Sequence, residues 1–253
     1  MSYHKAIIYG SILELYTYET HRGDIGGKRS GTSRGIVLPC VVEGGSVELQ
    51  RQLQKRQDNQ RRSEMAFRRL LVSNMGKSTA PLLVTVTYAS NQTDITVAYE
   101  DWKAFIGSMR YKFGKDFRYV AVPEFQRRGA VHFHALFWGL PSNLCNEERS
   151  TRLVASIWGH GFVDVYQTDG RVEIAGYLAK YMSKAYYDPR MFGKQMYRCS
   201  RNIFRPLVEH GVGMFYLSEV YGIGVDNPPC IDKQFQTQWW GTGRYRYYKN
   251  III

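Results

Sequence analysis

The sequence predicts an α+β fold, in which helices cover one face of a central, mostly antiparallel sheet. Segments with the alternating apolar pattern of strands are interleaved with segments of helical periodicity, in the order strand, helix, strand, strand, helix, strand, helix. Two of the strands are separated by only a short loop that contains glycine, which is typical of antiparallel neighbours. The 253 residues, of which 44% are hydrophobic and 14% aromatic, suffice for one ordinary domain with extensions.

The charge balance favours a nucleic-acid partner. Lys and Arg number 34 against 22 Asp and Glu, which gives a net charge of +12. Cations meet phosphates and aromatic rings stack on bases, so a basic chain with 19 Tyr and 5 Trp has the composition of a nucleic-acid-binding protein. Many soluble proteins are basic as well, so the charge carries weight only together with specific motifs.

Cysteine usage and hydropathy indicate a soluble, cytoplasmic protein. The four cysteines are far apart and form no C-x-x-C pair, which argues against a zinc knuckle and against a secreted disulfide scaffold. No apolar run approaches the length that spans a membrane, and the start, MSYHKAIIYG, lacks the apolar region of a signal peptide. The cysteines are Cys40, Cys145, Cys199 and Cys230.

Residues 1–75 are expected to form a basic N-terminal extension. The first 50 or so show little periodicity, and 21–35 are rich in Gly, Ser, Arg and Lys, which predicts a mobile basic segment able to touch phosphates. Residues 46–74 have helical periodicity, and the Arg-rich face of this helix could be solvated or could contact a nucleic-acid backbone. Its apolar side is predicted to hold Ala66, Phe67, Leu70 and Leu71.

The stretch Met75-Gly76-Lys77-Ser78-Thr79 resembles the end of a phosphate-binding loop, but it is better interpreted as a turn. The motif needs a glycine five residues before Gly76, where this chain has Leu71. The order of elements is also reversed, because here a helix precedes the loop and a strand follows it. The sequence therefore shows no nucleotide-driven motor.

Residues 76–210 are expected to form the main domain. Residues 81–88 are β-branched and apolar, as in a buried strand, and 94–113 form an amphipathic helix that ends at Gly114. Two strands follow over 117–126 and 130–138. The remaining elements are a helix that begins at a capping Asn146 and runs to Trp158, a strand over 162–166 and a helix over about 172–187. Residues 192–205 are basic and aromatic, and 211–253, with Trp239-Trp240, are expected to form an aromatic and basic C-terminal extension.

The strand over 130–138 carries a candidate metal site. Strict alternation in Val131-His132-Phe133-His134 places both imidazoles on one face of the strand. A three-residue loop, Arg127 to Gly129 with glycine in the left-handed position, would pair Gln126 with Ala130 and so place Glu124 opposite His132. Two imidazoles and a carboxylate with open positions suit Mg²⁺ or Mn²⁺ holding a phosphate. Taken alone, an H-x-H on a strand is more often incidental.

The helix over 172–187 carries a candidate nucleophile. Its doubled Tyr-x-x-Lys places Tyr177 and Tyr181 one turn apart on one face, and Lys180 and Lys184 repeat on an adjacent face. A phenol, with a pKa of about 10, attacks poorly unless its oxyanion is stabilised, which an ammonium group and a metal-polarised phosphate would do. Taken alone, the tyrosines are better explained as part of the apolar core stripe of an ordinary helix.

In this order, residues 83–88 (LVTVTY), 123–134 (PEF…VHFH) and 177–184 (YLAKYMSK) resemble the three motifs of rolling-circle replication initiators, the HUH endonucleases. They are similar in particular to the initiators of small single-stranded DNA phages and rolling-circle plasmids, including the two-tyrosine phage type. The resemblance covers roughly residues 80–205. It implies an HUH/RRM-like sheet and a location in the cytoplasm of a bacterial host.

The resemblance implies a set of roles for these residues. His132 and His134 would bind the divalent metal, with Glu124 as third ligand. Tyr177 or Tyr181 would attack the scissile phosphate of single-stranded DNA at a replication origin, leaving a 5′-phosphotyrosine and a free 3′-hydroxyl. The second tyrosine would serve strand joining, and Lys180 and Lys184 would stabilise charge or transfer protons. A host polymerase would extend the 3′-hydroxyl and a host helicase would unwind the duplex.

Basic residues near the motifs are candidates for guiding the single strand. Backbone contacts of this kind position DNA without reading its sequence, and solvated charge is the default for any one of them. Two lie at the hairpin tip and four follow the tyrosine helix: Arg127, Arg128, Lys194, Arg198, Arg201 and Arg205.

Three functions remain open from the sequence. The first is a metal-dependent endonuclease and strand transferase that starts rolling-circle replication, which the motif spacing and the doubled tyrosine favour. The second keeps this chemistry in a mobilisation relaxase or a single-strand transposase of the same superfamily. The third is a non-catalytic nucleic-acid-binding module, in which the histidines and tyrosines are core or stacking residues.

Overall fold

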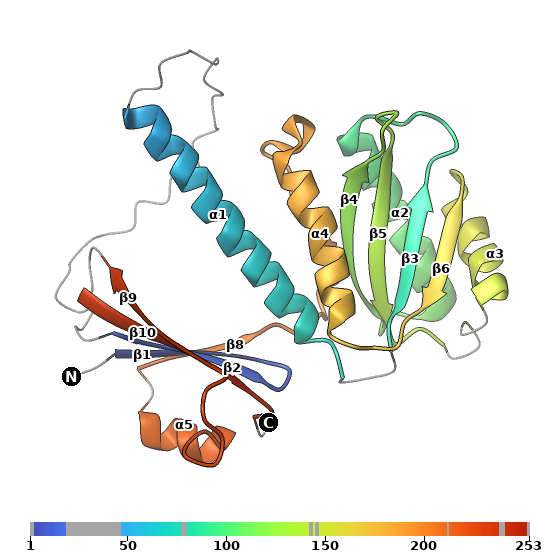
Figure 1. The fold of residues 1–253 in the computed structure, drawn as a ribbon. Helices are drawn as coiled ribbons and strands as arrows, with labels where there is room; N and C mark the ends of the chain where they lie inside the picture. Colours follow the sequence, from blue (N-terminus) through green and yellow to red (C-terminus); the bar gives the residue numbers. More distant parts are fainter. Residues whose placement is uncertain are drawn as a thin grey trace. The chain divides into compact units, whose positions relative to one another are not determined.

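The structure, a computed structural model, describes residues 3–18, 47–76, 80–141, 144, 147–211, 213–237 and 241–251. Within these residues it contains two antiparallel five-stranded sheets and five α-helices, which confirms the predicted α+β fold (Figure 1). The chain divides into two compact units, Gly35–Ile203 and Met1–Arg34 with Phe204–Ile253. The expected mobile segment 21–35, the end of the GKST turn, Asn146, Trp239-Trp240, Cys40 and Cys145 lie outside the described residues.

The larger unit is built on a sheet with the strand order β6-β3-β5-β4-β7. The strands are β3 Leu82–Thr87, β4 Arg118–Phe125, β5 Val131–Trp138, β6 Val163–Gln167 and β7 Arg198–Cys199. Its helices are α1 Val47–Val72, α2 Ile95–Phe113, α3 Glu147–Trp158 and α4 Glu173–Tyr187, and a 3₁₀ turn covers Pro189–Met191. The elements predicted for residues 46–187 are all present, with bounds that differ by one or two residues.

Helices cover both faces of this sheet. Val84, Phe133 and Phe137 point to one face and form a buried core with Trp102 of α2 and Trp158 of α3. Helix α4 packs on the opposite face, over β4 and β5 (Figure 1). The expectation that all helices lie on one face is therefore wrong for α4. Its own apolar stripe settles on the side chains of β4 and β5 that alternate with the main core.

Helix α1 packs along α4 within the same unit. Ser183 Oγ donates to Glu64 Oε1 at 2.6 Å, and Tyr186 Oη donates to the carbonyl oxygen of Arg56 at 3.1 Å. Phe67, Leu70 and Leu71 are buried as predicted, whereas the Ala66 side chain is exposed, so that part of the apolar stripe was wrong. The helix predicted as a possible DNA-contacting element thus also supports the tyrosine helix.

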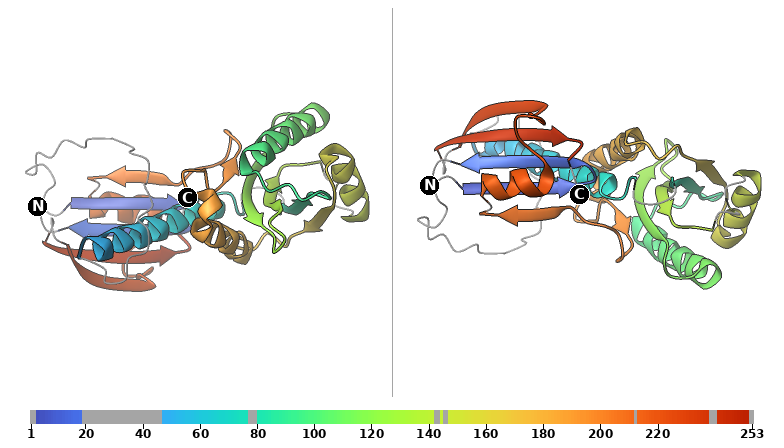
Figure 2. Two further views of the ribbon diagram at one scale, coloured as in Figure 1. Left: turned by 90° about the horizontal axis from the view of Figure 1, so that it is seen from above. Right: turned by 90° about the horizontal axis from the view of Figure 1, so that it is seen from below.

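The smaller unit joins the two ends of the chain in one sheet, with the order β8-β1-β2-β10-β9. Strand β2 pairs with β10, and α5 buries Leu217 and Tyr221 against one face of the sheet (Figure 2). This regular structure was not predicted from the sequence. The β1–β2 hairpin turns at Gly10, with φ 53°, and Ser11, which is a two-residue turn signal. The elements are β1 Tyr3–Tyr9, β2 Ile12–Tyr18, β8 Leu207–His210, α5 Met214–Tyr221, β9 Ile231–Thr237 and β10 Gly241–Lys249.

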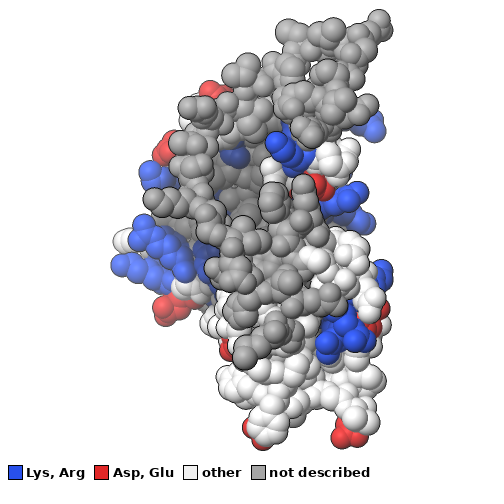
Figure 3. Space-filling model, turned by 90° about the vertical axis from the view of Figure 1, so that its left-hand side faces the viewer, with Lys and Arg blue, Asp and Glu red and all other residues white. Residues whose placement is uncertain are grey.

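The basic composition is visible on the surface. In the face that Figure 3 shows, patches of Lys and Arg are larger than those of Asp and Glu among the described residues. Helix α1 contributes exposed cations, among them Lys55, Arg61 and Arg62. Within the described part of the chain, no helix is long and apolar enough to cross a membrane.

Candidate metal centre and tyrosine pair

The turn between β4 and β5 fixes the register of the candidate metal ligands. The Gln126 amide donates to the Ala130 carbonyl at 2.8 Å, and the Gly129 amide donates to the Gln126 carbonyl at 2.8 Å. Gly129 has φ 91°, a backbone conformation that favours glycine. The predicted three-residue loop is therefore confirmed, and with it the pairing of Glu124 with His132.

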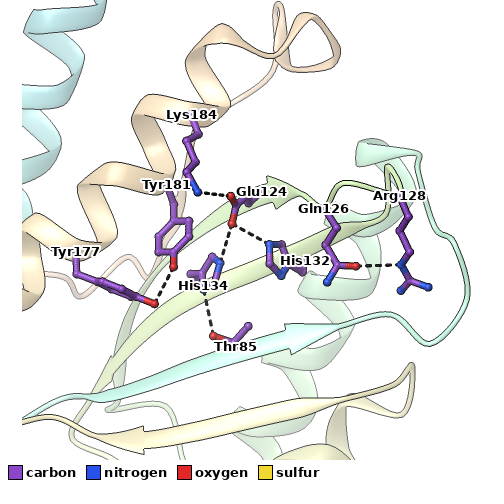
Figure 4. Close-up of polar contacts among 9 residues, drawn as sticks. All are labelled: Thr85, Glu124, Gln126, Arg128, His132, His134, Tyr177, Tyr181 and Lys184. Atoms are coloured by element: carbon purple, nitrogen blue, oxygen red, sulfur yellow. Dashed lines mark hydrogen bonds and ion pairs between the residues drawn. The ribbon is translucent and has the colours of Figure 1, made fainter.

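Glu124, His132 and His134 converge on one point (Figure 4). Glu124 Oε2 lies 2.9 Å from His132 Nε2 and 3.0 Å from His134 Nε2. Two ligands at right angles, each about 2.1 Å from a Mg²⁺ or Mn²⁺ ion, lie about 3 Å apart, so both separations fit neighbouring ligands of one ion. The three side chains come from rigid strands and leave room for further ligands, which suits an ion that also binds a substrate.

A hydrogen bond on the far side of the ring orients His134. Thr85 Oγ1 lies 3.1 Å from His134 Nδ1, and the two residues are direct cross-strand neighbours on β3 and β5. With Nδ1 engaged there, Nε2 faces Glu124. Partners of this kind commonly fix the ring and tautomer of metal-binding histidines.

Electrostatics keep the three groups in the protonation states that a metal requires. Burial and the neighbouring His132 lower the pKa of His134 to about 4, and burial also lowers the pKa of His132. Burial alone would raise the pKa of Glu124, but contacts with Lys184, His134 and His132 outweigh it and hold that pKa below its ordinary value. At neutral pH the site therefore offers two neutral imidazoles and an ionised carboxylate.

The tyrosine pair of α4 lies directly against this trio. The ring of Tyr181 stacks on His134, with centroids 3.6 Å apart and planes at 22°. Tyr181 Oη donates to Tyr177 Oη at 2.7 Å, and the Tyr177 side chain is exposed (Figure 4). Burial, followed by the contact with Tyr177, raises the pKa of Tyr181, so this phenol holds its proton at neutral pH. The two motifs thus form one site.

The two lysines of the doubled motif differ in their surroundings. Lys184 Nζ donates to Glu124 Oε1 at 2.8 Å and lies 5.0 Å from the centroid of the Tyr181 ring. Lys180 is exposed, and none of the described contacts that join Glu124, His134, Tyr181 and Lys184 involves it. The structure therefore brings Lys184 into the site and leaves Lys180 at its edge.

The two arginines at the hairpin tip also differ. Arg127 is exposed. The Arg128 guanidinium donates to the carbonyl of Tyr88 at 2.5 Å and to Gln126 Oε1 at 3.1 Å, so it ties the loop to the end of β3 (Figure 4). Arg127 is thus the freer candidate for a phosphate contact.

The basic residues after α4 lie apart from the metal ligands. Lys194 Nζ donates to Thr96 Oγ1 of α2, and the Arg198 guanidinium lies 4.0 Å from the centroid of the Tyr99 ring, also on α2. Arg201 lines a pocket with Arg110 near the end of α2. These three therefore lie on the side of the sheet that α2 covers, opposite to Glu124 and the histidines. Arg205 is exposed and belongs to the smaller unit.

Thr85 is a site residue that was not predicted from the sequence. A signal for it was present, because Thr85 and Thr87 alternate with the buried Val84 and Val86 of the first motif. Polar residues at alternate positions of an otherwise apolar strand indicate a face that carries polar side chains. What could not be read was which strand lies beside His134.

Comparison with known proteins links this segment to DNA replication. The model of a family of replication-associated proteins, the ORF2 type, matches residues 81–186, which is less than half of the chain. The match runs from the start of β3 to the end of α4 and so contains every residue that Figure 4 labels. No curated protein and no solved structure matches the chain.

Proposed function

We propose, from the match of residues 81–186 to a replication-associated family, that the protein initiates rolling-circle replication. In this proposal it nicks and rejoins single-stranded DNA at an origin through a 5′-phosphotyrosine. The observation that carries the proposal is the stacking of Tyr181 on His134, because it sets a pair of phenols beside a group of metal-ligand type. A core stripe of an ordinary helix would not place its tyrosines on a cluster of imidazoles and a carboxylate.

Glu124, His132 and His134 would hold the divalent ion, which we propose to be Mg²⁺ or Mn²⁺. When bound, such an ion polarises a phosphoryl oxygen and offsets the charge that develops on it. Zn²⁺ also accepts two imidazoles and a carboxylate, so the choice rests on the phosphate substrate, whose oxygen atoms suit the harder ions. The protein supplies the ligand set and its rigid placement on two paired strands.

The residues of α4 would carry the covalent step. The Oη atom of one tyrosine forms a bond to phosphorus while the bond from phosphorus to the 3′-oxygen breaks. The phenolic proton leaves, and the 3′-oxygen leaves as an alkoxide that takes up a proton. If Tyr177 attacks, Tyr181 already donates a hydrogen bond to its oxygen and would stabilise the developing phenolate.

Two phenols within hydrogen-bonding distance would serve two successive transfers. The second hydroxyl lies close enough to the first to reach a phosphate bound in the same place. Nicking and rejoining conserve the number of phosphodiester bonds, since each tyrosine–phosphate bond replaces one and is then replaced. The 3′-hydroxyl would be extended by a host polymerase, with unwinding by a host helicase. A relaxase or single-strand transposase would use the same step on another substrate.

The decisive experiment follows covalent adduct formation. Wild type, Tyr177→Phe, Tyr181→Phe and the double variant are incubated with labelled single-stranded origin DNA and Mn²⁺, and adducts are resolved on denaturing gels. Tyr187→Phe, an exposed tyrosine on the same helix, is the matched control. We expect adducts with wild type and Tyr187→Phe and none with the double variant. Nicking by the double variant would exclude tyrosine as nucleophile, and binding without any adduct would favour a non-catalytic module.

A further inference from the structure

The part of the sheet that α4 leaves uncovered carries two exposed aromatic rings. Phe162, just before β6, has 76% of its surface exposed, and Tyr166 on β6 has 54% exposed. Exposed rings of this size on a strand, rather than on a loop tip, are costly unless something packs on them.

Both rings lie on the same face of the sheet as the metal ligands. Thr85 pairs with His134 on one side and with Asp164 on the other, so these three side chains share a face. Phe162 and Tyr166 stand two positions before and after Asp164 and therefore point the same way. Neighbouring strands are about 4.8 Å apart, which places this row about 10 Å from His134.

The backbone that presents the rings is held closely. The Thr87 amide donates to the Phe162 carbonyl at 2.8 Å, and Trp158 Nε1 donates to the Thr87 carbonyl at 3.1 Å. A Cβ atom added to Gly161 would lie 2.3 Å from the Ala89 nitrogen, so only glycine allows this approach of the two backbones. The rings are thus displayed from a fixed strand, at low entropic cost for a ligand that stacks on them.

We propose that Phe162 and Tyr166 form a base-stacking platform for the single strand whose scissile phosphate occupies the metal site. The proposal rests on the function proposed above and adds the path of the DNA, from β5 across β3 to the edge strand β6. Base stacking on aromatic rings tolerates any sequence because every base has a π-face. The two residues are about 13 Å apart along the strand, so each would take a separate base rather than two adjacent stacked ones.

Asp164, exposed between the two rings, indicates which side of the strand faces the sheet. Its carboxylate would repel phosphates, so the sugar–phosphate backbone should lie away from β6 with the bases toward it. A carboxylate also accepts hydrogen bonds from the exocyclic amino group of cytosine. The rings therefore suit nucleobases better than a backbone-binding groove would.

The test measures binding of the full-length protein to a labelled single-stranded oligonucleotide by fluorescence anisotropy, with EDTA present. We expect Phe162→Ala and Tyr166→Ala each to weaken binding about fivefold or more. Phe162→Trp and Tyr166→Phe, which keep a ring, should bind like wild type. Tyr111→Ala removes a ring that is 94% exposed on α2, which covers the opposite face, and should have no effect. The dependence of binding on salt should stay unchanged, because stacking releases no counterions.

The outcomes separate this inference from the proposed function. If the doubly substituted Phe162→Ala, Tyr166→Ala protein binds as tightly as wild type, or if wild type binds no single strand, the platform is refuted. An equal loss with Tyr111→Ala refutes it as well, since the effect would not depend on the face. If wild type forms no covalent adduct but the ring variants alone lose binding, the platform stands and the nuclease proposal fails. If wild type nicks and the double variant binds and nicks equally well, only the platform fails.

Discussion

The ring of Tyr181 on α4 lies flat on the ring of His134 on β5, with centroids 3.6 Å apart. This contact places the tyrosine helix on the strand that carries the histidines. Because the phenol ring makes the contact and its hydroxyl points to Tyr177, the ring and the hydroxyl of Tyr181 can be altered separately.

Tyr181→Phe and Tyr181→Ala should therefore have different effects. Phe keeps the stacked ring, so we expect its free energy of unfolding to stay within about 0.5 kcal/mol of wild type. Ala removes the ring from a half-buried position and should cost about 2 kcal/mol. Chemical denaturation monitored by circular dichroism measures both values. Equal stability of the two variants would show that the stacking does not hold α4 in place.

The hydroxyl of Thr85 should tune metal affinity through His134. Thr85→Val keeps the shape of the side chain but removes the partner of Nδ1, and loss of such a partner typically lowers metal affinity about 10- to 100-fold. Thr85→Ser should restore most of the affinity. Mn²⁺ titration by calorimetry or electron paramagnetic resonance gives the dissociation constants without requiring activity.

Thr87→Val is the matched control for Thr85→Val. Thr87 stands on the same face of β3, opposite His132, and no hydrogen bond from its hydroxyl to an imidazole is among the contacts described. Its affinity for Mn²⁺ should match that of wild type. A loss with both variants would assign the effect to the strand as a whole rather than to the tautomer of His134.

Metal should stabilise the folded protein, and this gain should depend on Glu124. An ion that binds only the folded state, at 100 times its dissociation constant, adds about 2.7 kcal/mol to the free energy of unfolding. Glu124→Gln removes the charge that the two imidazoles share, so the Mn²⁺-induced rise in melting temperature should largely disappear. Glu148→Gln, an exposed glutamate on α3, serves as control and should keep it. An undiminished rise in Glu124→Gln would remove Glu124 from the ligand set.

Lys184 and Lys180 should prove unequal in the nicking assay. Lys184 contacts both Glu124 and the Tyr181 ring, whereas Lys180 stands outside those contacts. We expect Lys184→Met to lower the rate of adduct formation by about 100-fold, within the range for a positioned acid–base group, and Lys180→Met to change it little. The reverse order would mean that substrate binding rearranges the helix.

The sequence allowed the local parts of the site to be predicted, and their arrangement in space less so. Alternation placed His132 and His134 on one face, and the Gly129 loop gave the register of Glu124, because both depend on residues close together in the chain. The stacking of Tyr181 on His134 depends on which face of the sheet α4 covers. Helical periodicity shows that a stripe is buried but not what it is buried against.

The same limit explains what was missed elsewhere in the chain. The turn at Gly10 and Ser11 was a readable hairpin signal, but the pairing of β2 with β10 joins opposite ends of the chain and leaves no local trace. Arg128 looked free in the sequence, and only the fold shows that the carbonyl of Tyr88 binds its guanidinium.

The Gly129 turn provides a last prediction, in which two Gly→Ala substitutions should have opposite effects on stability. Gly129 has φ 91°, and an added Cβ would make only ordinary contacts, the nearest 3.5 Å from Thr93 Cγ2, so Gly129→Ala should cost about 1 to 2 kcal/mol through backbone strain alone. Gly107 lies within α2 with nothing near its would-be Cβ, so Gly107→Ala should stabilise the protein by about 0.5 to 1 kcal/mol. Denaturant unfolding measures both. Because the strained turn also sets Glu124 opposite His132, only Gly129→Ala should weaken Mn²⁺ binding as well. Unchanged metal affinity in that variant would show that the ladder of β4 and β5 fixes the register without the turn.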